Sequence, residues 1–243
     1  MAARLFSRLS SVEAETSWGL LTAINSIIIA YVLIVVGTLV GTYLLGESAA
    51  ALPISWLIGC ALMVGFVMIS RRRSAADWAA MRMESTGRTL VFVALVSLGV
   101  AIALDVLSLG VTREFLPVPE LFSLYQQESS APSWVAAVLL MVIAQPIGEE
   151  LIFRGVALPV LRRTLGAWPG LLVGALAYGL FHQLAYSSPT SNSVLTWYGL
   201  VLPFLGGIYL GGVRVYTGST RAAIVAHMAF GVFAVLKALT VAG

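Results

Sequence analysis

The stretch Gln145–Arg154, QPIGEELIFR, decides what kind of molecule this chain forms. It continues an apolar run that begins near residue 133, and it places Glu149, Glu150 and Arg154 inside that run. An ionisable side chain at the centre of a membrane helix costs roughly 2.5–3.5 kcal/mol on insertion scales. Three such groups on one helix therefore indicate a functional site.

The composition excludes a soluble protein. Of the 243 residues, 59% are hydrophobic and only 10% are charged, and the mean hydropathy is +0.96. Such a chain is typical of an integral membrane protein. The formal net charge is +3, and the basic residues form short clusters between apolar runs, so we expect no nucleic-acid partner. Cys60 is the single cysteine, which excludes an internal disulfide and predicts a small buried side chain.

Seven apolar stretches are long enough to cross a bilayer, which takes about 20 residues each. The sequence therefore predicts an all-α, polytopic transmembrane bundle of about seven or eight spans, forming a single integral membrane domain over 1–243. The first stretch is too long for a signal-peptide core, so we expect an uncleaved anchor preceded by a short amphipathic segment with Arg4 and Arg8. The stretches lie near 19–45, 51–69, 89–109, 133–153, 168–186, 195–213 and 222–240.

The arginines predict the orientation. Seven spans with a cytoplasmic N-terminus place every arginine cluster on the cytoplasmic side, as the positive-inside bias requires, and the C-terminus outside. The segment 110–132 then becomes an external or interfacial loop, to which the sequence assigns no role. The clusters lie at the N-terminus (Arg4, Arg8), between 71 and 88 (Arg71, Arg72, Arg73, Arg82, Arg88), after residue 153 (Arg154, Arg162, Arg163) and near residue 218 (Arg214, Arg221).

Glycines at four-residue spacing predict close helix packing, because small residues let helix backbones approach each other in lipid. No Lys-Ser or Lys-Thr pair follows any of them, which excludes a phosphate-binding loop. The glycines are Gly37 and Gly41, then Gly166, Gly170 and Gly174, then Gly207 and Gly211.

Helix geometry gives the two glutamates different roles. At about 100° per residue, Glu150 and Arg154 stand about 40° apart, whereas Glu149 points about 140° away from Arg154. Glu150 and Arg154 can therefore form an ion pair, which leaves Glu149 as the candidate general base. We expect Pro146 and Gly148 to kink the helix and to open space for water.

Alternatives remain at this point. The charged triplet could be an ion cluster at a helix end, and a histidine in an apolar helix is often a satisfied core residue. The chain has only two histidines, His182 and His227, and both follow the glutamates inside apolar stretches, which favours a shared site. Neither lies in an HExxH motif or has an acid three residues before it, so we expect no metal and no cofactor. No G-x-S-x-G motif supports a serine hydrolase.

Three ordered motifs resemble those of the CAAX-protease and bacteriocin-processing family of intramembrane glutamic endopeptidases, also called the Rce1-like or Abi family. The resemblance covers about 130–235, which would be the catalytic core. The motifs are Glu149-Glu150-x-x-x-Arg154 on one span, Tyr178-x-x-x-His182 on the next and His227 at the start of the last.

The resemblance implies an endopeptidase that hydrolyses peptide bonds of membrane-associated or lipidated substrates without an acyl-enzyme. Glu149 would be the general base, His182 its water-orienting partner and His227 the oxyanion donor. The chain departs from the family pattern at Tyr178, where Phe is common, and at Gly231, where the pattern has an Asn. With that side-chain donor lost, the oxyanion hole either recruits another group or is weaker, and in the second case Gly231→Asn is expected to raise the rate.

Two rival functions use the same polar cluster. A non-proteolytic scaffold or immunity-type protein would use it as a structural clamp, and Gly231 favours this reading. A proton-coupled transporter would use Glu149 as a carrier, but clear inverted repeats are missing. Arginine greatly outnumbers lysine, of which Lys237 is the only one, and this indicates a prokaryotic inner membrane. The expected partners are the bilayer and a peptide or protein substrate that enters partly through it, while the sequence leaves the oligomeric state open.

Overall fold

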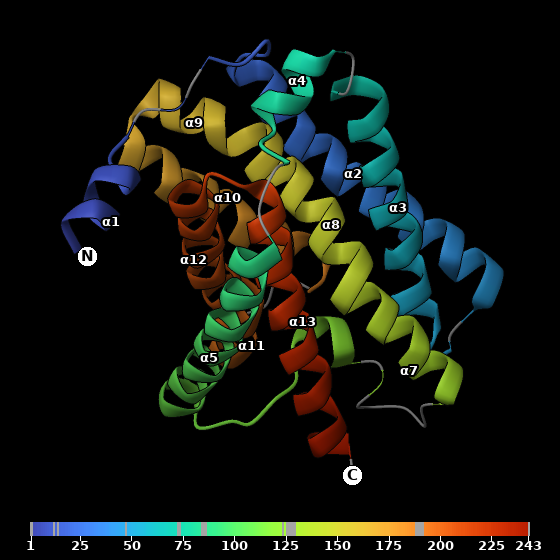
Figure 1. Ribbon diagram of the computed structural model, residues 1–243. Helices are drawn as coiled ribbons and strands as arrows, with labels where there is room; N and C mark the ends of the chain where they lie inside the picture. Colours follow the sequence, from blue (N-terminus) through green and yellow to red (C-terminus); the bar gives the residue numbers. More distant parts are fainter. Residues whose placement is uncertain are drawn as a thin grey trace.

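The computed structural model describes residues 2–11, 13, 15–46, 48–71, 74–83, 87–122, 124, 130–187 and 192–242. Within these ranges every regular element is a helix, and the helices pack as one bundle (Figure 1). This confirms the predicted all-α membrane bundle. The elements outside the central helix are α1 (Ala2–Leu9), α2 (Leu20–Leu45), α3 (Ala51–Arg71), α4 (Ala75–Ala80), α5 (Gly87–Thr112), η1 (Pro119–Leu121), α10 (Ala167–Ala185), α11 (Ser193–Thr196), η4 (Trp197–Val201), α12 (Leu202–Thr217) and α13 (Thr220–Ala242).

Six helical stretches of the described residues are long and apolar enough to cross a membrane. They correspond to six of the seven expected spans, and their bounds are Leu20–Leu45, Ala51–Arg71, Thr89–Thr112, Ala131–Leu165, Ser193–Thr217 and Thr220–Thr240. The seventh expected span is α10, a 19-residue helix that packs against α9 and α12. His182 and Gln183 lower its hydropathy, and both side chains lie inside the bundle.

A 35-residue helix, Ala131–Leu165, runs through the middle of the bundle (Figure 1). It consists of α7 (Ala131–Val138), η2 (Leu139–Ala144), α8 (Gln145–Glu150), η3 (Leu151–Ala157) and α9 (Leu158–Leu165). The expected end at residue 153 was therefore wrong, and Arg154, Arg162 and Arg163 lie on the helix rather than in a loop. Arg154 and Arg162 are buried there with protein partners, so they do not need water.

The continuation of the central helix to Leu165 brings Glu149 to the same level in the bundle as His182. Glu149 and His182 lie at similar distances along the chain from the turn at Gly166, where α9 gives way to α10. A helix that ended at residue 153 would have left Glu149 near one membrane face and His182 deep in the bilayer.

The prolines widen the helices instead of breaking them. The described residues contain three π-helical segments, η2, η3 and η4, and each ends two residues before a proline: Pro146, Pro159 or Pro203. A proline ring clashes with the carbonyl four residues earlier, and it has no N–H to donate. A wider turn removes this clash while the helix continues. The kink expected at Pro146 is thus replaced by wide turns on both sides of Glu149 and Glu150.

The glycine pattern positions the helices that support the site. A Cβ at Gly37 would lie 2.5 Å from backbone atoms of α3, and one at Gly170 would lie 2.4 Å from Arg162 Cα, so packing at these positions requires glycine. Gly166 was expected to serve packing but forms the turn between α9 and α10, where its φ is +95°. Large apolar side chains, such as Leu21 and Leu39 on α2, remain exposed on the outside of the bundle, where the lipid would lie.

The N-terminal segment is fixed by a charged cluster at one end of the bundle. The Glu13 carboxylate accepts a hydrogen bond from Arg214 at 2.6 Å and lies 3.3 Å from both Arg82 and Arg162. Burial alone would raise the pKa of Glu13, but the three arginine charges outweigh burial and hold that pKa below its usual value. Three arginines from separate clusters therefore meet at the same end of the molecule as the N-terminal segment.

Candidate active site

Glu149 is completely buried and is held by two tyrosines. Tyr178 donates its hydroxyl proton to Glu149 Oε2 at 2.8 Å, and Tyr186 donates to Oε1 at 2.7 Å. No salt bridge joins Glu149 to an arginine or lysine of the described residues, as the helix geometry predicted. The carboxylate is positioned by neutral donors, which leaves it free to take a proton.

Glu150 and Arg154 form the predicted ion pair. Arg154 Nη1 donates to Glu150 Oε1 at 2.8 Å, and Nη2 donates to the carbonyl of Gly207 on α12 at 3.0 Å. Both side chains are buried. The guanidinium also lies 4.3 Å from the centre of the Tyr178 ring, which adds a cation–π contact. The pair thus connects the central helix to α10 and α12.

His182 is held with one ring nitrogen toward the backbone and the other toward the carboxylates. Nδ1 lies 3.3 Å from the carbonyl oxygen of Tyr178, which can only accept, so Nδ1 carries the proton of this hydrogen bond. Nε2 lies 3.7 Å from Glu149 Oε2, which is too long for a direct hydrogen bond. His182 therefore faces Glu149 across a short gap.

His227 on α13 completes the group. Its Nδ1 lies 3.1 Å from Glu150 Oε1, and its Nε2 lies 3.4 Å from the Tyr178 hydroxyl. The fold thus brings together all the predicted catalytic residues, Glu149, His182 and His227, around Tyr178. Glu150 supports His227 as well as Arg154, a contact that spacing along one helix could not predict.

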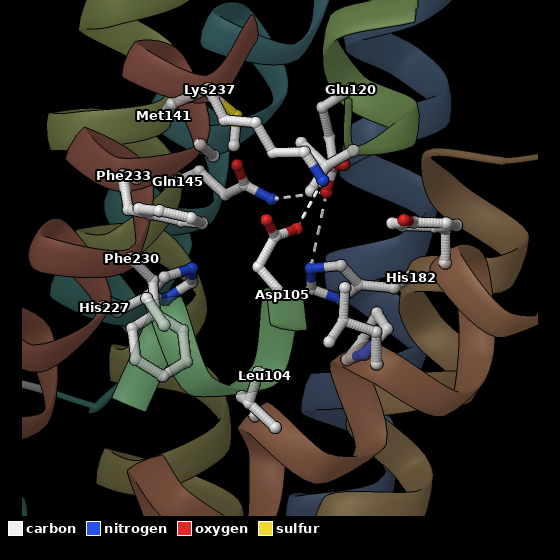
Figure 2. A pocket seen from close by; sticks show the side chains of 18 of the residues that line it. Leu104, Asp105, Glu120, Met141, Gln145, His182, His227, Phe230, Phe233 and Lys237 are labelled. Atoms are coloured by element: carbon white, nitrogen blue, oxygen red, sulfur yellow. Dashed lines mark hydrogen bonds and ion pairs between the residues drawn. The ribbon is translucent and has the colours of Figure 1, made fainter. Parts of the chain in front are cut away.

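A cavity of about 120 Å³ lies beside this group. A buried water needs roughly 10–15 Å³ measured in this way, so the cavity has room for several. Tyr178, His182 and His227 are among the residues that line it, as are Asp105 and Lys237, which form an ion pair. Figure 2 shows Gln145, Glu120 and His182 linked by dashed lines within it. Glu149 itself is not on the wall, so Tyr178 and His182 stand between it and the cavity.

Gly231 is a packing residue, and the gain in rate expected from Gly231→Asn stays a prediction. A Cβ at this position would lie 1.9 Å from the carbonyl oxygen of Met141 on the central helix. Atoms at that distance overlap, so α13 and η2 must move apart for any side chain. The glycine lets these two helix backbones touch beside the cavity.

The sequence reasoning missed three residues of the site. Tyr186 lies four residues after His182 and Gln145 four residues before Glu149, so helical spacing from the known candidates could have identified both. Glu120 belongs to the 110–132 segment and had no such signal. It is buried, accepts a hydrogen bond from Gln145 at 3.2 Å and lies 3.6 Å from His182 Nε2.

The described residues contain no group of three or more His, Cys, Asp or Glu side chains placed to bind one metal ion. Cys60 is a free and completely buried thiol, as predicted, and it lies against Tyr186.

Comparison with known proteins agrees with the geometry. Residues 131–233 match the family described as type II CAAX prenyl endopeptidase Rce1-like. These residues form an Rce1-like domain. The Rce1-like domain contains the central helix from its first residue and every predicted catalytic residue, so the resemblance read from the motifs is confirmed. With its apolar helices, the chain is an integral membrane protein that contains this Rce1-like domain.

The chain also has a curated relative. An uncharacterized protein of Bacillus subtilis (strain 168), YyaK, is 31% identical to this chain over 121 residues, which are 49% of this chain and 40% of YyaK. The chain therefore aligns with less than half of that relative's length. No solved structure matches the chain.

Proposed function

We propose that this protein is an intramembrane endopeptidase that cleaves peptide bonds in membrane-associated or lipidated proteins or peptides with a water activated by Glu149. The observation that carries the proposal is the buried group of Glu149, His182 and His227 around Tyr178, next to a cavity with room for water.

In the proposed reaction, a water beside His182 Nε2 gives a proton to Glu149 as its oxygen bonds to the substrate carbonyl carbon. With Nδ1 donating to Glu150, the imidazolium form of His227 would donate from Nε2 to the oxyanion that forms. The Tyr178 hydroxyl, 3.4 Å from Nε2, would leave Glu149 once that carboxylate is protonated and would donate to the same oxyanion. The proton then passes to the amide nitrogen as the C–N bond breaks. Tyr178 would thus supply a donor that the Gly231 position lacks.

We infer the membrane location and the orientation of the protein from its hydropathy and from the positions of its charges. We place the protein in a prokaryotic inner membrane, with its N-terminus in the cytoplasm. The meeting of Arg82, Arg162 and Arg214 at one end of the bundle supports this orientation, because arginine-rich ends usually face the cytoplasm. The substrate would enter partly through the membrane.

Glu149→Gln tests the proposal, because the amide keeps the shape but cannot take a proton. Cleavage of reporter peptides in liposomes should be abolished, while the melting temperature stays near wild type. His182→Ala should behave alike, and His227→Ala should lower kcat by roughly 10²–10³-fold. Glu15→Gln is the control, because the Glu15 carboxylate is exposed.

Metal independence is a separate prediction. Activity should survive exhaustive chelation, and one tightly bound metal that restores activity would favour a metalloprotease.

The second candidate is a non-proteolytic scaffold or immunity-type membrane protein. It is favoured by the complete enclosure of Glu149 under two tyrosines and by Gly231. Full proteolysis by a folded Glu149→Gln variant would rule out the proposed mechanism. A cell that keeps the protein's biological role with this variant, with membrane-protein fragments unchanged, would identify the scaffold.

A further inference from the structure

Glu120 is a buried carboxylate that no motif explains. It lies in the segment after α5, within the short helix η1, and 4% of its surface is exposed. Leu121 and Leu124, which follow it, are also buried and anchor this part of the segment in the bundle. A carboxylate in such a place needs polar partners, because its desolvation is costly.

The segment that carries Glu120 is fixed from two other helices. Tyr198 on η4 donates to the carbonyl oxygen of Glu114 at 3.0 Å, and the Lys237 ammonium on α13 lies 4.4 Å from the centre of the Phe115 ring. Glu120 therefore has a defined position relative to the site.

The partners of Glu120 belong to the candidate active site. Its Oε1 accepts a hydrogen bond from Gln145 at 3.2 Å and lies 3.6 Å from His182 Nε2. Glu149 Oε2 lies 3.7 Å from the same nitrogen. Figure 2 shows Glu120 and His182 turned toward each other. Two carboxylates therefore flank His182 Nε2, and of these only Glu120 is on the cavity wall.

The hydrogen-bond donors and acceptors around His182 Nε2 indicate that a water molecule fits between these atoms. Because Nδ1 of His182 donates to the Tyr178 carbonyl, Nε2 of the neutral ring presents a lone pair. Nε2 and the two carboxylate oxygens are then all acceptors, at separations too long for direct hydrogen bonds. A water molecule supplies two O–H donors, enough for two of these three acceptors. The two carboxylate oxygens lie 3.6 and 3.7 Å from the same nitrogen, so a water beside that nitrogen can donate one O–H to each carboxylate. Its oxygen lone pairs stay free for attack.

We propose that Glu120 is a further catalytic residue, which accepts one O–H of the attacking water from the cavity side, beside His182, while Glu149 accepts the other. This inference rests on the proposed endopeptidase function. Glu149 takes the proton from that water, the water oxygen bonds to the carbonyl carbon, and the proton leaves with the amide nitrogen. Glu120 holds the second O–H of the water throughout.

The first test compares Glu120→Gln with Glu114→Gln, which changes an exposed carboxylate of the same segment. Glu120→Gln should lower kcat by about 10²-fold with little change in KM, because the amide holds the water less well than a carboxylate. Glu114→Gln should match wild type. In Glu120→Ala, added formate should restore part of the rate in proportion to its concentration, and Glu114→Ala should not respond.

A second readout needs no substrate. The chain has only two histidines, so ¹⁵N-histidine labelling gives ring signals from His182 and His227 alone. Glu120→Gln should shift the Nε2 signal of His182 and leave those of His227 in place, and Glu114→Gln should shift neither.

Two outcomes would overturn the proposal. One is wild-type kcat in Glu120→Gln while Glu149→Gln is inactive, which leaves the endopeptidase intact without Glu120. The other is a loss of activity with unmoved His182 signals and no rescue by formate, which makes Glu120 a structural residue only. Failure of the endopeptidase proposal would appear separately, as full activity in Glu149→Gln.

Discussion

The hydroxyl of Tyr178 joins the two halves of the site at the scale of single residues. It donates to Glu149 and lies beside His227, while the ring stacks on Arg154 and the backbone carbonyl holds His182. A phenylalanine would keep the ring and the backbone contacts and would lose only the hydroxyl.

Tyr178→Phe should therefore separate catalysis from structure. We expect kcat to fall by roughly 10²–10³-fold, as for a lost oxyanion donor, with KM nearly unchanged. Tyr209→Phe is a matched control, because it removes a tyrosine hydroxyl that bonds Ser97 away from the site. Equal loss in both variants would contradict the role of the Tyr178 hydroxyl.

The variant Arg154→Ala tests the Glu150–Arg154 ion pair. Arg154→Ala leaves the Glu150 carboxylate buried without its cation, which should cost about 3–5 kcal/mol of unfolding free energy. The measurement is thermal unfolding and folded yield in detergent. Arg163→Ala is the control, since Arg163 is partly exposed and lies 4.0 Å from the exposed Glu15. If both variants melt like wild type, the Glu150–Arg154 pair does not stabilise the fold.

At the scale of helices, α13 touches the central helix through Gly231. Gly231→Ala and Gly231→Asn should both destabilise the fold by about 1–3 kcal/mol or more, because each forces α13 away from Met141. Differential scanning fluorimetry in detergent measures this. Gly99→Ala on α5 adds a methyl group in open space and should not lower the melting temperature. A more active and equally stable Gly231→Asn would show that the helices separate easily.

How far the sequence predicts these elements depends on the range of the interactions. Apolar length predicted the spans, and 100° spacing separated Glu149 from Glu150, because both are local properties. The central helix ran beyond its predicted end because Arg154 and Arg162 find partners in Gly207 and Glu13, which are remote in sequence. Glu120 escaped prediction for the same reason, since neither periodicity nor motif spacing links it to His182.

At the scale of the whole molecule, Glu13 ties the N-terminal segment to α9, α12 and the segment after α4. Because the pKa of Glu13 is depressed in the fold, the stability it contributes is present above the unfolded value of about 4.3 and is lost as the pH falls through the folded pKa.

Hydrogen exchange of the N-terminal segment measures this dependence. In wild type, residues 9–11, where Arg162 holds the carbonyls of Leu9 and Ser11, should lose protection as the pH falls below about 4.3, beyond the intrinsic pH effect. Glu13→Gln should weaken protection above that pH and remove the pH dependence. Glu15→Gln, with its exposed carboxylate, should behave like wild type. Unchanged protection in Glu13→Gln would mean that the arginines hold the segment without it.

The position of Glu13 has a consequence for biosynthesis. Glu13 leaves the ribosome 201 residues before its partner Arg214. The segment around Glu13 is therefore synthesised before most of the membrane helices, and Arg214 becomes available to it only when α12 has been made. A nascent chain that stops before α12 lacks Arg214 and leaves this end of the bundle open, and the synthesis of α12 closes it.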